Sequence, residues 1–156
     1  MGMIRGFMNG ALAGAAGTTA LNAVTYLDMV MRARPASSTP ETTVKKLSER
    51  ADVPIPGSGE ERQNRISGLG PLFGIATGMG VGAILGAIQG AGARPPAAVT
   101  ILLASAGAMA VSILPMTQLG VTDPRKWQTQ DWISDVVPHV AYGAVTAHVL
   151  ENMREH

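Results

Sequence analysis

Four polar side chains stand in otherwise apolar stretches of the sequence and are its candidates for chemistry: Asp28, Asp135, His139 and Tyr142. Asp135 and His139 are four residues apart, so on a helix they share a face and could relay a proton. Two metal-binding side chains without a third are too few for a metal site, and we predict none. Structural roles are simpler, because Asp28 precedes Arg32 by four residues and Asp135 suits the first turn of a helix.

The segments that must position these side chains are apolar and built from small residues. The chain of 156 residues is 46% hydrophobic but only 4% aromatic, and it contains 19 glycines, whereas soluble cores depend on large aromatic side chains. Residues 6–27, 66–93 and 95–122 hold no charged side chain, and each stretch exceeds the roughly 20 residues that cross a bilayer. We therefore predict an all-α, polytopic membrane protein, a single domain over residues 1–156 with transmembrane helices at about 4–31, 66–93, 95–116 and 133–150.

Glycine recurs at every fourth position of the second predicted span. Each four-residue step turns a helix by about 400°, so such a row leaves a bare groove in which a second helix approaches backbone to backbone. The first predicted span repeats the spacing, and we expect glycine-zipper packing between small-residue faces. The residues of this predicted interface are Gly70, Gly74, Gly78, Gly82, Gly86 and Gly90 in the second span and Gly6, Gly10 and Gly14 in the first.

The polar segment 32–65 is the one sizeable piece outside the predicted spans. Thr-Pro-Glu at 39–41 is typical of a helix start, and Val44, Leu47 and Ala51 then fall on one side. We predict a short amphipathic helix on the membrane surface. In the four-span topology, nine of the 12 Lys and Arg residues lie on the side of this segment, so the positive-inside rule places loop 32–65 in the cytoplasm, with the spans in the plasma (inner) membrane.

Several classes of function are disfavoured by what the sequence lacks. It has no cysteine, no phosphate-binding glycine loop after a strand, no nucleophile elbow and no HExxH pair, and we expect neither enzymatic activity nor a cofactor. His139 and His148 are nine residues apart, half a turn out of phase, so one helix cannot grip a haem with both. A net charge of +1 without interleaved aromatic and basic residues argues against nucleic acid.

Two segments carry a resemblance to known proteins: WQTQDWISDVVPHVAYG at 127–143 and RPASSTPE at 34–41. Together they resemble a recurrent type of small four-span membrane protein of actinobacteria. Such proteins are similar in size and build to accessory subunits beside large transport or respiratory complexes, including lipid importers of the mammalian-cell-entry type. The resemblance implies a class of role and no catalytic residue.

These observations together predict a non-catalytic membrane accessory subunit. We expect its small-residue helix faces to pack against a larger membrane transport complex, one for lipid import being an example, rather than against a second copy. Two alternatives stay open. One is a small homo-oligomeric transporter or channel in which Asp28, Asp135 and His139 line a polar path. The other is a subunit that holds a haem or a quinone, the quinone in a small apolar cleft beside His139 and Tyr142.

Overall fold

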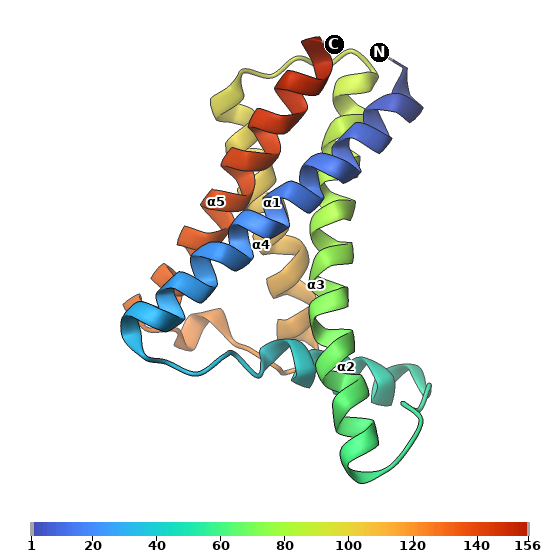
Figure 1. Cartoon of the computed structure of the whole chain (residues 1–156), viewed down its shortest axis with the longest axis vertical. Helices are drawn as coiled ribbons and strands as arrows, with labels where there is room; N and C mark the ends of the chain where they lie inside the picture. Colours follow the sequence, from blue (N-terminus) through green and yellow to red (C-terminus); the bar gives the residue numbers. More distant parts are fainter. Residues whose placement is uncertain (1, 156) are drawn as a thin grey trace.

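The computed structural model describes residues 2–155, and all their regular structure is helical (Figure 1). The prediction of an all-α fold is confirmed. The elements are α1 (Met3–Arg32), α2 (Thr39–Ala51), α3 (Gly59–Gly90), α4 (Ala97–Gln118), the short 3-10 helix η1 (Pro124–Lys126) and α5 (Thr129–Glu155).

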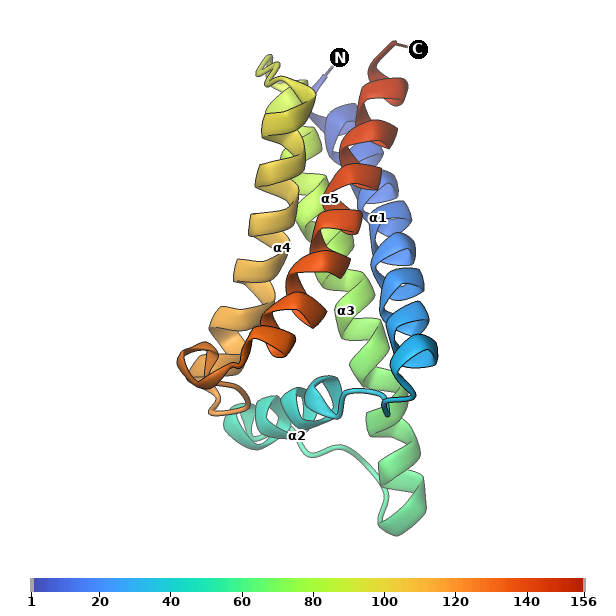
Figure 2. The ribbon, with the colours of Figure 1, turned by 90° about the vertical axis from the view of Figure 1, so that its left-hand side faces the viewer.

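The four long helices form an antiparallel bundle, with α1 packed against α3 and α5, and α4 packed against α5 and α3. Figures 1 and 2 show both ends of the chain at one end of this bundle and α2 lying across the other. We call these the terminal end and the α2 end. The one connection at the terminal end, from α3 to α4, is short, and the other links lie at the α2 end, so successive long helices run in opposite directions.

Small residues fill the interior of the bundle, and large apolar side chains lie on its surface. Its buried apolar positions are mostly alanine and glycine, and the largest fully buried side chains are Tyr142, Ile66 and Thr146. Large apolar side chains on every long helix are exposed instead, and they include Phe7, Leu12, Phe73, Ile84, Leu102, Leu114, Val137 and Val140. A folded protein in water rarely exposes so extended an apolar surface.

Two of the four long helices, α3 and α4, are long and apolar enough to cross a membrane. By the same test of length and apolarity, α1 and α5 do not qualify. Glycine, Thr18, Thr19 and Asn22 lower the mean hydropathy of α1, and Asp135 and His139 lower that of α5.

The helix bounds differ from the predicted spans mainly at α3 and α5. The helix α3 begins at Gly59, in the predicted extramembrane segment 32–65 and ahead of the predicted span, and ends at Gly90 rather than at residue 93. Its first two turns are polar, and the first turn contains Glu60 and Glu61, whose negative charges suit the positive end of a helix. The helix α5 extends from Thr129 to Glu155, beyond the predicted 133–150, and Pro138 does not break it.

The amphipathic helix α2 packs on the first half of α3. The Glu41 carboxylate accepts hydrogen bonds from Ser67 Oγ at 2.6 Å and from Gln63 Nε2 at 3.0 Å. Thr43 and Val44 are buried. These contacts fix α2 across the end of the bundle, as Figure 2 shows.

Candidate functional site

The closest helix pair in the bundle is α1 with α3, and glycines make the contact. We call this the glycine seam; it consists of Gly6, Gly10 and Gly14 of α1 and Gly78, Gly82, Gly86 and Gly90 of α3. A Cβ added to Gly10 would overlap the carbonyl oxygen of Gly82, and one added to Gly82 would overlap that of Gly10. Even alanine would force the two backbones apart there.

The glycine row of α3 does not serve one interface along its whole length. Gly70 faces Pro40 of α2, where an added Cβ would lie 3.1 Å from the Pro40 Cβ. A Cβ on Gly74 would meet nothing within 4 Å. Figure 1 shows the reason, because α1 crosses α3 near the terminal end and runs away from it toward the α2 end. Gly74 is therefore an uncovered position between two filled ones.

A second feature is a row of polar side chains along one face of α5: Asp135, His139, Tyr142 and Thr146. We call it the polar stripe. The Tyr142 hydroxyl donates to the carbonyl oxygen of Gly78 at 2.6 Å, and Thr146 Oγ1 donates to that of Ala13 at 3.4 Å. Both side chains pass over Gly17, where a Cβ would overlap Thr146 Oγ1. This half of the stripe attaches α5 to α3 and α1.

The other half of the stripe holds the predicted acid and base side by side. His139 Nδ1 lies 2.7 Å from the Asp135 carbonyl oxygen and 3.6 Å from Asp135 Oδ2. Asp135 Oδ2 is buried and has no hydrogen-bond partner among the described residues, and the same holds for Ser105 Oγ beside Gly143. The Asp135 carboxylate thus has one buried oxygen, Oδ2, that faces His139 and accepts no hydrogen bond from a described residue.

The remaining predicted acid, Asp28, lies in a separate cluster at the α2 end. Its carboxylate accepts from Arg34 Nε at 2.5 Å and from Arg32 NH1 at 3.3 Å, and Arg32 NH1 also donates to Ser134 Oγ at 2.8 Å. The expected pair with Arg32 is present, and Arg34 joins it. The structure therefore brings Asp135, His139 and Tyr142 onto one face, while Asp28 bonds to arginines instead.

The turn before α5 is held by its own polar side chains. Asp123 Oδ1 accepts from Arg125 Nε at 2.9 Å, and this hydrogen bond holds the pKa of the Asp123 carboxyl below its usual range. The Trp127 indole donates to Thr122 Oγ1 at 2.9 Å and packs edge-on against Trp132, with ring centroids 4.9 Å apart. Paired tryptophans beside cations suit a membrane interface.

Sequence reasoning overlooked three residues of these clusters. Gly17 is off the four-residue glycine spacing, and Arg34 falls beyond the end of α1. Thr146 follows Tyr142 by four residues, so the helical period could have added it to the stripe.

Within the described residues, no group of three or more His, Asp or Glu side chains could hold a metal ion.

Comparison with known proteins finds no relative of the chain. No family model, curated protein or solved structure matches the chain.

Proposed function

We propose that the chain is a non-catalytic integral membrane protein of the plasma membrane that crosses the bilayer four times. It serves as an accessory subunit that docks on a larger membrane transport complex. The observation that carries this proposal is the inverted packing of the bundle, with small residues inside and large apolar side chains exposed on all four long helices.

The proposal includes α1 and α5 as spans because their polar groups are turned inward or satisfied locally. Thr18 Oγ1 donates to the Gly14 carbonyl oxygen at 2.8 Å, and Thr25 Oγ1 donates to that of Leu21 at 2.9 Å. Their outward side chains, such as Phe7 and Val140, are apolar. Lipid would cover that surface, and helix pairs in lipid associate through small residues, as α1 and α3 do. The helix α2, with the rest of loop 32–65, would then lie on the cytoplasmic face.

The partner would dock on the part of α3 around Gly74, which no other helix of the chain covers. The seam glycines already contact α1, whereas Gly74 faces open space and its neighbours Leu72, Phe73 and Ile75 are exposed. A bare backbone flanked by large apolar side chains fits one transmembrane helix of a partner, itself with a small residue at the contact.

Co-purification from the native membrane in mild detergent tests the docking. We expect a stoichiometric membrane partner with the wild-type chain and its loss with Gly74→Leu, because the new side chain fills the contact. Gly80→Leu is the matched control, since Gly80 also has nothing within 4 Å but points to another side of α3. Retention of every partner by Gly74→Leu would show that this position does not dock.

A proton-coupled transporter is the second candidate, favoured by the buried Asp135 Oδ2 beside His139. In that case Asp135→Asn and His139→Ala would abolish proton flux into liposomes that contain the purified chain, while assembly stays intact. Equal flux in wild type and both variants would eliminate this candidate.

A further inference from the structure

At the terminal end of the bundle, where the glycine seam ends, lies a pocket of about 130 Å³. Its floor is formed by Gly6 of α1 and Gly86 and Gly90 of α3, which have no side chains to fill it. Its rim carries Gln89, Arg94 and Arg154. Roughly 15 Å³ of such free volume already holds a water molecule, so this pocket has room for a group of several heavy atoms.

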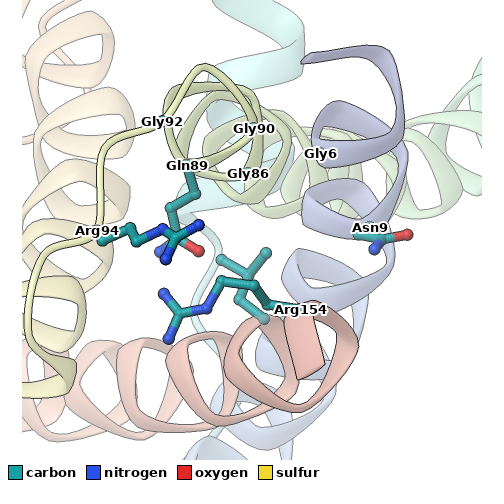
Figure 3. A pocket seen from close by; sticks show the side chains of 9 residues that line it. Gly6, Asn9, Gly86, Gln89, Gly90, Gly92, Arg94 and Arg154 are labelled. Carbon is teal, nitrogen blue, oxygen red and sulfur yellow. The ribbon is translucent and has the colours of Figure 1, made fainter. Parts of the chain in front are cut away.

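The two arginines come from different elements and converge on the pocket. Figure 3 shows Arg94, from the link between α3 and α4, and Arg154, from the last turns of α5, extending toward each other beside Gln89. Gly92 makes this possible, because its φ of 111° belongs to the region that favours glycine and turns the link back over the end of α3.

The charges around the pocket favour an anion. Among the side chains that the structure describes, no acidic one lines it. Glu151 Oε1 lies 3.7 Å from Arg154 NH2, whereas Arg94 has no ion pair or hydrogen bond with any described residue. The helices α1 and α4 both begin at this end without an acidic residue in the first turn, so their positive ends are not neutralised.

The opposing contributions are the C-terminal ends of α5 and α3, whose carbonyl groups would repel an anion. The link already satisfies several of these groups, since Ala91, Gly92 and Ala93 donate to the carbonyl oxygens of Ala87, Gln89 and Ile88 at 2.9, 3.0 and 3.3 Å. Two full guanidinium charges outweigh the remaining partial charge.

From this geometry we propose that the pocket binds a phosphate group. Two guanidinium groups and a side-chain amide offer the forked set of N–H donors that phosphate oxygens accept in pairs. The group would come from an anionic lipid headgroup or from free phosphate. A headgroup fits the proposed membrane placement, because exposed Ile88 and Val99 lie next to this end and offer apolar surface to acyl chains. The inference does not use the docking at Gly74.

Binding to the full chain purified in mild detergent distinguishes these sources. The probes are phosphatidylglycerol, zwitterionic phosphatidylcholine and inorganic phosphate, and native mass spectrometry with thermal unfolding reports binding. We expect phosphatidylglycerol to bind more tightly than phosphatidylcholine, and Arg94→Gln or Arg154→Gln each to weaken it about tenfold. Stabilisation by inorganic phosphate with no lipid preference would identify free phosphate as the source.

Two further variants separate recognition from damage to the fold. Arg5→Gln removes an exposed cation on α1 that does not line the pocket, so it should leave binding within about twofold. Glu151→Gln removes the carboxylate that lies 3.7 Å from Arg154 NH2 and should tighten binding, which a misfolded variant would not do. The proposal would be overturned if Arg94→Gln and Arg154→Gln each bound phosphatidylglycerol as tightly as the wild type does, and each bound inorganic phosphate as tightly as well. A chain that stays soluble without detergent would instead contradict the membrane placement and leave the phosphate test valid.

Discussion

Several residues of this protein matter mainly because they let two helix backbones approach closely. At the glycine seam, the absence of a side chain lets the carbonyl oxygens of Gly10 and Gly82 occupy space that a Cβ would need. At the polar stripe, Tyr142 reaches from α5 to the Gly78 carbonyl oxygen and connects two helices. Small residues and a few long polar ones therefore have complementary roles in the interior.

Gly10→Ala should destabilise the bundle, because its methyl group would collide with the backbone at Gly82 and Gly86. We expect a loss of about 2 kcal/mol in the free energy of unfolding. Gly74→Ala is the control, since nothing lies within 4 Å of its added Cβ. Unfolding in mixed detergent measures both, and equal stability of the two variants would argue against a close seam.

Tyr142→Phe should cost about 1 kcal/mol of stability, because it removes a buried hydrogen bond and keeps the ring. The same unfolding assay measures the change. Tyr26→Phe is a matched control, since Tyr26 is exposed on α1 and makes no hydrogen bond with a described residue. If both variants lose the same stability, the Tyr142 hydroxyl does not bridge α5 and α3.

The helices themselves illustrate what the sequence could and could not predict. Apolar length and the glycine spacing predicted long helices, and the Thr-Pro-Glu start predicted α2, whose first residue is Thr39. The predicted span began only at residue 66, but the polar residues from Gly59 to Arg65 belong to the same helix, and Ser58 followed by Glu60 and Glu61 marks its start in the sequence. The uncovered position at Gly74 depends on the angle at which α1 crosses α3, and no local pattern encodes that angle.

Glu41→Ala should release α2 from α3, because the Glu41 carboxylate accepts the bonds from Ser67 and Gln63. We expect faster amide hydrogen exchange across α2, with the exchange of α5 unchanged. Glu49→Ala changes an exposed acid of the same helix that pairs with Lys46 at 3.8 Å, and it should leave exchange near wild type. Unchanged exchange in Glu41→Ala would mean that other contacts hold α2.

The whole molecule joins a tightly packed terminal end to a more open α2 end. The seam and the Arg94–Arg154 pocket lie at the first, while Gly74 and the helix α2 lie toward the second. The overall charge and composition predicted a membrane chain, but the division of the glycine row between a seam and an uncovered position emerged only from the assembled bundle. The docking proposed at Gly74 depends on the bundle standing upright in a bilayer, whereas phosphate binding at the Arg94–Arg154 pocket does not.

Single-cysteine labelling tests this central claim most directly, because the natural sequence has no cysteine. Exposed Ser58 and Gln128 would each be replaced by cysteine at the α2 end, and exposed Ala93 and Asn152 at the terminal end. With a membrane-impermeant maleimide on intact cells, we predict labelling at positions 93 and 152, and labelling at 58 and 128 only after permeabilisation. Labelling of positions 58 and 93 from the same side of the membrane would contradict the four-span account.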